Sequence, residues 1–138
     1  MKKAVDTELK NNDVLIMTAA VADYKPAKVS SKKLKKEKNL TEIKITKTAD
    51  ILSSVKKENK IIVGFALETD DEITNAKKKL KEKHLDMIVL NSLKDKKSGF
   101  EFDTNKVTLI KKSAGTINLP LQSKFQIANK ILSEILNS

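Results

Sequence analysis

Residues 61–91 read IIVGFALETDDEITNAKKKLKEKHLDMIVLN. This stretch begins and ends with a continuous apolar run, at 61–66 and 87–90, of the kind found in strands that are buried on both faces of a sheet. The residues between them, 72–83, place apolar side chains on one face of a helix: Ile73, Ala76 and Leu80. An amphipathic helix between two buried strands predicts a right-handed crossover, and therefore a parallel α/β sheet.

Upstream of this stretch, the apolar pattern adds further elements. A short helix is predicted over 2–11, and another strand buried on both faces over 14–17. A polar and basic segment follows at 18–39, and a loop of this length inside a compact domain is typical of a functional or mobile segment. Alternation at 40–46 predicts a half-exposed strand. A short helix comes next, with two candidate N-caps: Thr48 and Asp50.

Downstream, the pattern changes to short alternating strands separated by turn residues. These strands are predicted at 100–102, 107–110 and 116–119. The segment 123–136 then predicts a helix with one apolar stripe, formed by Ile127, Ile131, Leu132 and Ile135. The helix at 72–83 has its own candidate caps: Thr69, Asp70 and Asp71. We therefore expect a single α/β domain over residues 1–138.

Composition excludes several classes of site. The chain has 138 residues and no cysteine, so a disulfide framework, a zinc–thiolate site and a cysteine nucleophile are excluded. Its single histidine, His84, excludes a site with several histidine ligands and reads as an exposed residue at a helix end. No apolar run approaches the ~20 residues that span a bilayer, and we expect a soluble, cytoplasmic protein.

The net charge of +10 comes entirely from lysine, because all 28 basic residues are lysines. Proteins that read bases favour the planar arginine fork, whereas lysine supplies point charges that suit phosphate groups. With only five aromatic residues, the chain also has no stacking platform for bases. A small phosphorylated ligand is therefore favoured over nucleic acid, although bulk charge leaves a basic nucleic-acid-binding module as an alternative.

Ligands of parallel α/β sheets bind beyond the carboxyl ends of the strands. Three segments are predicted to meet there: 18–26, 67–71 and Asn91. The loop at 18–39 carries closely spaced lysines that could close over phosphates, namely Lys32, Lys33, Lys35 and Lys36. By spacing alone, such a cluster is more often a solvated surface. Three carboxylates could bind Mg²⁺, but helix capping explains them at least as well: Glu68, Asp70 and Asp71.

Several motifs together resemble a known family. They are MTAAVADYKP at 17–26, KLKK at 33–36, TADIL at 48–52, VGFALET at 63–69, and HLDMIVLN followed by GFEFDTNKVTLI at 84–91 and 99–110. In this order and spacing they closely resemble the phosphopantothenate–cysteine ligases, or phosphopantothenoylcysteine synthetases, of coenzyme A biosynthesis. The resemblance covers nearly the whole chain.

This resemblance implies a fold, a reaction and partners. The fold would be Rossmann-like, with a mostly parallel sheet, flanking helices and a C-terminal antiparallel strand extension at 99–120 in contact with a second subunit of a homodimer. The segment 18–39 would be a mobile lid. The reaction would join the carboxylate of 4′-phosphopantothenate to CMP, with CTP as co-substrate, Mg²⁺ as cofactor and pyrophosphate as product. The amine of L-cysteine would then displace CMP from the acyl cytidylate.

The resemblance also implies roles for individual residues. Lys33, the first lysine of KLKK, would be the catalytic lid lysine that offsets negative charge as the acyl cytidylate forms. Lys79 and Lys83, four residues apart on one helix face, would reach the triphosphate. The remaining nucleotide-binding positions would be Met17, Thr18, Ala19, Asp23, Ala49, Asp50, Ile51, Leu52 and Phe65. No metal-binding residue is implied.

One departure from the family pattern leaves alternatives open. The family's ligase domain begins with a strand, a glycine/serine-rich turn containing an asparagine, and the first helices, and none of these matches the residues here. The chain is therefore expected to start inside a helix of the family fold. It would then be a fragment, one half of a split enzyme, or a chain with a misplaced start, and CTP binding without ligation is the alternative to the full reaction.

Overall fold

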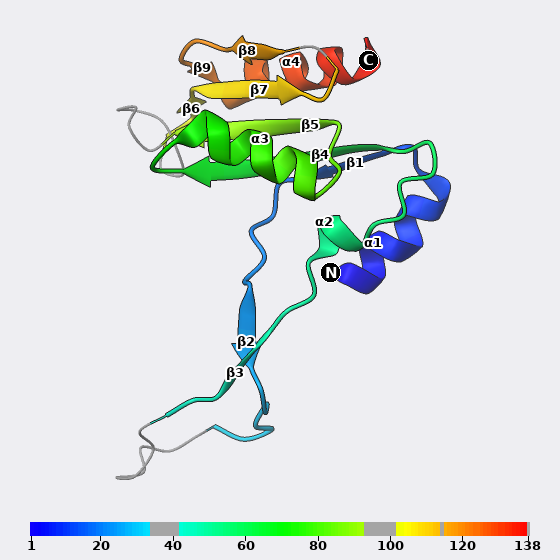
Figure 1. The fold of residues 1–138 in the computed structure, drawn as a ribbon, viewed down its shortest axis with the longest axis vertical. Coiled ribbons are helices and arrows are strands. Elements are labelled where there is room, and N and C mark those ends of the chain that lie inside the picture. Colours follow the sequence, from blue (N-terminus) through cyan, green and yellow to red (C-terminus); the bar gives the residue numbers. More distant parts are fainter. Residues whose placement is uncertain (34–41, 93–101, 114, 138) are drawn as a thin grey trace.

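The computed structural model describes residues 1–33, 42–92, 102–113 and 115–137. Its main sheet has the strand order β1-β4-β5-β7-β8 (Figure 1). The strands are β1 Val14–Met17, β4 Ile61–Glu68, β5 Met87–Ser92, β7 Val107–Lys111 and β8 Thr116–Asn118. The first three are parallel to one another, and β7 and β8 continue the sheet as antiparallel strands. The mostly parallel α/β sheet with an antiparallel extension confirms the predicted fold class.

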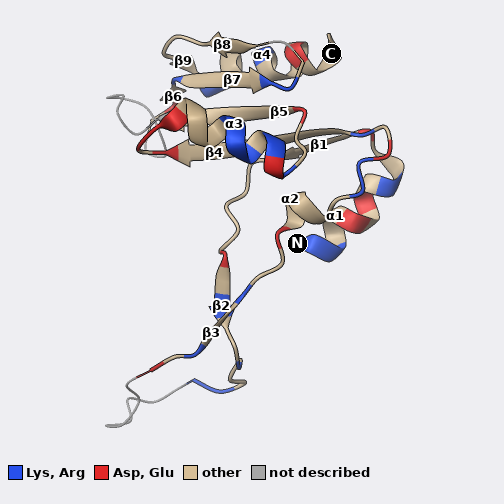
Figure 2. Cartoon of the chain, viewed as in Figure 1, with Lys and Arg blue, Asp and Glu red and all other residues tan. Residues whose placement is uncertain are grey.

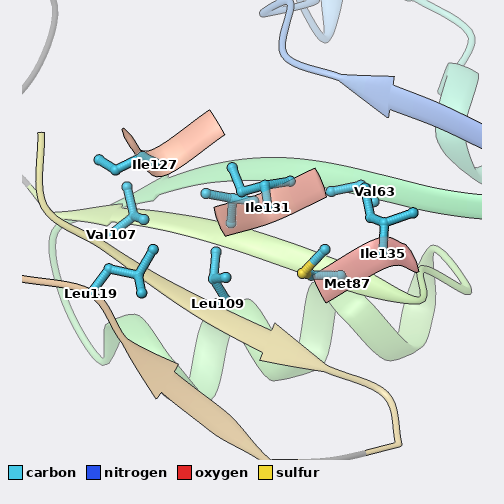
Figure 3. Close-up of a cluster of buried hydrophobic side chains, with 9 residues drawn as sticks. Val63, Met87, Val107, Leu109, Leu119, Ile127, Ile131 and Ile135 are labelled. Atoms are coloured by element: carbon cyan, nitrogen blue, oxygen red, sulfur yellow. The ribbon is translucent and has the colours of Figure 1, made fainter. Parts of the chain in front are cut away.

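Each central strand is buried on both faces, because consecutive side chains point to opposite sides of the sheet. Val63 and Val89 belong to one cluster of buried side chains, to which α4 (Lys124–Leu136) contributes Ile131 (Figure 3). Ile62 and Ile88 belong to a second cluster on the other face, together with Ala76 of α3 (Glu72–Glu82). The continuous apolar runs of β4 and β5 thus fill two cores at once.

The other helices complete the second face. The helix predicted at 2–11 is observed as α1 Lys2–Glu8 followed by the 3₁₀ helix η1 Leu9–Asn11, and α2 spans Ile51–Ser54. Leu9 and Leu52 pack against the second cluster. Gly64 is needed at this contact, since a Cβ at that position would lie 2.8 Å from Leu85 Cδ1.

A long antiparallel ribbon extends away from the main sheet (Figure 1). It consists of β2 Tyr24–Pro26 and β3 Ile45–Lys47, all exposed. We call the described residues 24–33 and 42–47 the arm. At its base, the Thr48 backbone N–H donates to the Asp23 carbonyl at 2.8 Å, and the Thr48 hydroxyl donates to the Ala22 carbonyl. The segment predicted as a lid therefore comprises a connecting stretch at 18–23 and the first part of the arm at 24–33, while its residues 34–39 lie outside the described part.

Three local predictions differ from the structure. β1 is an edge strand of the described sheet and only Met17 is buried in it, because an apolar run does not reveal how many neighbours a strand has. The predicted strand at 40–46 is observed as the fully exposed β3, with residues 40 and 41 outside the described part. Phe102 lies in a bend, and the rest of the strand predicted at 100–102 is not described. Instead β6 (Thr104–Asn105) pairs with β9 (Gln122–Ser123).

Of the two helix starts with predicted caps, the cap is confirmed at α2 and wrong at α3. Ser123 forms a capping box with Gln126 at the start of α4, and Asp50 caps α2. At α3 the N-cap residue is Asp71, but it has a left-handed φ of 43° and its side chain makes no capping hydrogen bond. Among the helices in the described ranges, none combines the length and apolar character needed to cross a bilayer.

Candidate functional site

A cavity of about 420 Å³ opens at the carboxyl ends of β1 and β4. A volume of this size is within the range of small-molecule sites. Four separate segments form its wall: the turn after β1, the approach to α2, the end of β4 and one face of α3. The lining residues are Met17, Ala19, Ala20, Val21, Ala22, Asp23, Thr48, Ala49, Asp50, Ile51, Leu52, Phe65, Leu67, Lys79 and Lys83.

Small side chains dominate the wall contributed by the turn after β1. Ala19, Ala20 and Ala22 line the cavity there, and Ala49 adds another methyl side chain from the approach to α2. Side chains this short leave the backbone N–H and C=O groups within reach of a ligand. Phe65 is half-buried and supplies the aromatic part of the wall. The cavity wall therefore combines small side chains with one aromatic ring.

Two lysines of α3 supply positive charge to the same cavity. Lys79 and Lys83 are four residues apart, so they lie on one face of the helix, as predicted. In the structure each of them has a carboxylate partner: Lys79 Nζ lies 2.5 Å from Glu68 Oε1, and Lys83 Nζ lies 3.0 Å from Asp50 Oδ2. Figure 2 shows these charges on α3 and at the end of β4.

Asp50 has two structural partners as well as its place in the cavity wall. Its Oδ1 accepts a hydrogen bond of 3.1 Å from the Ser53 backbone N–H, which caps α2, and its Oδ2 contacts Lys83. Burial alone would raise the pKa of the Asp50 carboxyl. The Ser53 hydrogen bond and the Lys83 ammonium outweigh burial and hold this pKa below its ordinary value of 3.8.

The structure brings most of the predicted site residues together. Met17, Ala19, Asp23, Ala49, Asp50, Ile51, Leu52, Phe65, Lys79 and Lys83 all line the cavity. Thr18 and Lys33 do not: Thr18 lies between two lining residues but is not one of them, and Lys33 is an exposed residue on the arm. Their neighbours Lys35 and Lys36 fall outside the described residues. The roles of all these residues in binding stay predictions.

Five of the lining residues were not predicted individually as site residues, although four of them lie in the segments expected beyond the strand ends: Ala20, Val21, Ala22, Thr48 and Leu67. The signal for them was present. Residues 20–22 lie between two predicted site residues, and Leu67 follows Phe65 by two positions along β4, which puts both side chains on one face of the strand. Thr48 was considered only as a helix cap.

One strand end does not join the cavity. Asn91 of β5 was expected to meet the other two segments, but it is absent from the lining residues. Its side-chain N–H donates to the Ala66 carbonyl at 3.3 Å, and its Oδ1 accepts from Asn105 Nδ2 at 2.7 Å. Asn91 therefore links β4, β5 and β6. Within the described ranges, no group of three or more histidine, cysteine, aspartate or glutamate side chains could hold a metal ion.

Comparison with known proteins identifies relatives across the whole chain. The family model described as the DNA/pantothenate metabolism flavoprotein C-terminal domain matches residues 1–138. A cysteine/cysteine sulfinic acid decarboxylase of an unknown prokaryotic organism is 48% identical over 99% of the chain, and the coenzyme A biosynthesis bifunctional protein CoaBC of Bacillus subtilis is 42% identical over 98% of it. The chain spans only 39% and 34% of the lengths of these two relatives.

Two solved structures have a similar fold. The crystal structure of the C-terminal domain of a coenzyme A biosynthesis bifunctional protein CoaBC superimposes with a TM-score of 0.77 at 38% identity, covering 97% of this chain and 58% of that one. A DNA/pantothenate metabolism flavoprotein from Streptococcus pneumoniae has a TM-score of 0.70 at 23% identity, covering 98% and 65%, and is similar in fold.

Proposed function

The chain belongs to the family of DNA/pantothenate metabolism flavoprotein C-terminal domains, and from this membership we propose that it binds CTP and serves the ligation of 4′-phosphopantothenate to L-cysteine in coenzyme A biosynthesis. The observation that carries the proposal is the cavity itself. It joins small residues after β1, the aromatic ring of Phe65 and two lysines of α3 in one wall. These are surfaces for a sugar and base at one end and for phosphates at the other.

The proposed reaction needs no nucleophile from the protein. The carboxylate of 4′-phosphopantothenate attacks the α-phosphorus of CTP, the bond to the β-phosphate oxygen breaks, and pyrophosphate leaves. The amine of L-cysteine then attacks the acyl carbon of the cytidylate, and CMP leaves with the electron pair of the broken C–O bond. The protein contributes by positioning the reactants and by offsetting charge on the phosphates, and both contributions can be large.

The chain's own residues fit these two tasks. Met17 and Ala19 line the cavity at the end of β1, and Asp23 follows at the base of the arm. Lys79 and Lys83 place ammonium groups at the wall where the phosphates would lie. Lys33 is the proposed lid lysine, and it must reach the cavity from the arm.

Mg²⁺ fits this site as a companion of the nucleotide. Magnesium is usually held by one or two carboxylates together with substrate phosphates, rather than by a cage of protein ligands. Asp23 is a carboxylate of the cavity wall that has no ion pair to a lysine among the described contacts, so it is the residue that would contact such an ion. The ion would supply further neutralisation of phosphate charge.

Isothermal titration of the chain with CTP and with ATP, each in Mg²⁺ buffer, tests the proposal. We expect CTP to bind with a clear preference over ATP. Equal affinity for the two nucleotides, or no binding, would contradict it. A short DNA duplex serves as a control for bulk charge: a basic nucleic-acid-binding module would bind it with steep salt dependence and show no nucleotide preference.

CTP binding without ligation is the second candidate function. The observation that supports it is the length of the chain relative to the bifunctional relatives. The chain corresponds to about a third of the bifunctional relatives, so the complete reaction and the homodimer are proposals for the whole protein. Formation of pyrophosphate from CTP and 4′-phosphopantothenate distinguishes the two candidates. Sedimentation of the chain tests the homodimer.

A further inference from the structure

Glu68 has a mostly buried carboxylate beside the cavity that the proposed reaction does not use. It is the last residue of β4, and its side chain is only 12% exposed. Its Oε1 lies 2.5 Å from Lys79 Nζ, yet this atom accepts no hydrogen bond within the described part of the chain. The contact with Lys79 is therefore the interaction that offsets the cost of burying this oxygen.

Lys79 contacts Glu68 and also lines the cavity. Its side chain is 45% exposed and lines the cavity, whereas Glu68 is not among the lining residues. Lys79 thus both contacts the carboxylate and borders the cavity. A lysine has a flexible stem and three N–H donors, so it can contact an anion in the cavity while it still feels the charge of Glu68.

The geometry points to Glu68 as the counter-ion of Lys79. We propose that its carboxylate holds the ammonium at the cavity wall while the cavity is empty, and competes with the phosphates of the ligand once they bind. Glu68 is then a positioning residue that acts through Lys79. The inference rests on the proposed function in one respect, because it takes the ligand to carry several phosphates.

The competition follows from the charges. A triphosphate brings several negative charges toward an ammonium that already has a carboxylate partner. Glu68 repels the phosphate charges, and solvent screens this repulsion little because the carboxylate is mostly buried. Replacing Glu68 by a neutral residue of the same shape removes this repulsion and leaves Lys79 to the ligand alone. The neutral variant should therefore bind phosphates more tightly than the wild type.

The test compares wild type and Glu68→Gln by isothermal titration with Mg²⁺–CTP, inorganic tripolyphosphate and cytidine. We expect the variant to bind CTP and tripolyphosphate roughly three- to tenfold more tightly at ~0.1 M salt, with part of the gain remaining at ~1 M because salt screens a mostly buried charge less than an exposed one. Cytidine has no phosphate, so its affinity should not change. A purely structural role for Glu68 would weaken the binding of all three probes or leave it unchanged.

Two further variants control for charge and for folding. Glu82→Gln removes a carboxylate from α3, the helix that carries Lys79. Glu82 lies 3.9 Å from Lys78, and neither residue lines the cavity, so this variant should leave all affinities unchanged. Glu68→Asp keeps the charge and should not show the gain. Glu68→Ala is a second neutral variant with the same expectation as Glu68→Gln, and failure of both neutral variants to fold would overturn the proposal.

The probes separate this inference from the proposed function. If wild type prefers CTP and Glu68→Gln shows no gain, the counter-ion role is wrong and the proposed function stands. If wild type binds tripolyphosphate but has no preference for CTP, the proposed function fails, and a gain in Glu68→Gln still supports the counter-ion. If wild type binds neither probe, both are overturned.

Discussion

Lys83 Nζ lies 3.0 Å from Asp50 Oδ2, which joins the C-cap residue of α3 to the N-cap residue of α2 across the cavity wall. Both residues line the cavity, and Asp50 also accepts the Ser53 backbone N–H. One carboxylate thus fixes the start of α2 and the position of a cavity lysine. Loss of this carboxylate should be detectable both in stability and in ligand binding.

We expect Asp50→Ala to lower the free energy of unfolding by about 1 kcal/mol, because α2 loses its N-cap. The Lys83 contact adds little to this loss, since the Asp50 side chain is 45% exposed and surface ion pairs are weak. Asp50→Asn retains a capping oxygen and should lose about half as much or less. Urea denaturation measures both variants.

Asp13→Ala is the matched control for this prediction. Asp13 is 94% exposed and lies 3.6 Å from Lys60, so its removal should change stability by less than about 0.5 kcal/mol. Equal losses for Asp13→Ala and Asp50→Ala would show that the cap does not stabilise α2.

The pH dependence of stability follows from the lowered pKa of Asp50. A carboxyl group whose pKa is lower in the folded than in the unfolded state contributes stability above its ordinary pKa, here 3.8, and loses it as the pH falls through the lowered value. The stability difference between wild type and Asp50→Asn should therefore be constant near neutral pH and shrink below 3.8. Denaturation curves across this range measure it, and a difference that grows with acidification would contradict the assignment.

The sequence predicts the centre of this fold better than its edges. The strands β4 and β5 and the helix α3 follow from two apolar runs and one helical stripe. The end of β4 does not, because Leu67 and Glu68 continue the strand by pairing with Asn91 and Ser92, and three of these four residues are polar and give no local sign of a strand. The edge position of β1 is equally hidden, since it depends on partners that lie far away in the sequence.

The candidate site is likewise only partly predictable from the sequence. Strand ends and family motifs indicate most of the residues that line the cavity, because parallel strands bring their carboxyl ends to one side. The pairings are different: Glu68 is 11 positions from Lys79 and Asp50 is 33 positions from Lys83, and only the packing of α3 against the sheet brings each pair together. The use of Asn91 as a link between strands was hidden for the same reason.

Two adjacent residues of α4 test the core. Ile131 is 4% exposed and packs against the sheet, whereas Leu132 is 48% exposed on the same helix (Figure 3). We expect Ile131→Ala to lower the free energy of unfolding by about 3 kcal/mol, from lost burial and the cavity left behind. Leu132→Ala should cost less than about 1 kcal/mol. Similar losses in urea denaturation would mean that α4 does not pack on the face described.

Lys33 decides between a ligase and a binding domain. It is exposed on the arm and absent from the cavity lining, so Lys33→Ala should leave the unfolding midpoint unchanged. If the arm brings this ammonium to the phosphates as the acyl cytidylate forms, turnover of the ligase should fall about 100-fold, the scale of losing one charge-stabilising group in a transition state.

Lys28→Ala is the control, because Lys28 is another exposed lysine of the arm with no predicted role in the reaction. Its turnover should stay within about twofold of wild type, since bulk charge at one exposed site contributes little once solvent screens it. Equal losses for both variants would assign the effect to the general charge of the arm. A Lys33→Ala protein that melts at lower temperature with normal turnover would remove Lys33 from the reaction, because the arm lysine would then stabilise the fold and not the developing phosphate charge.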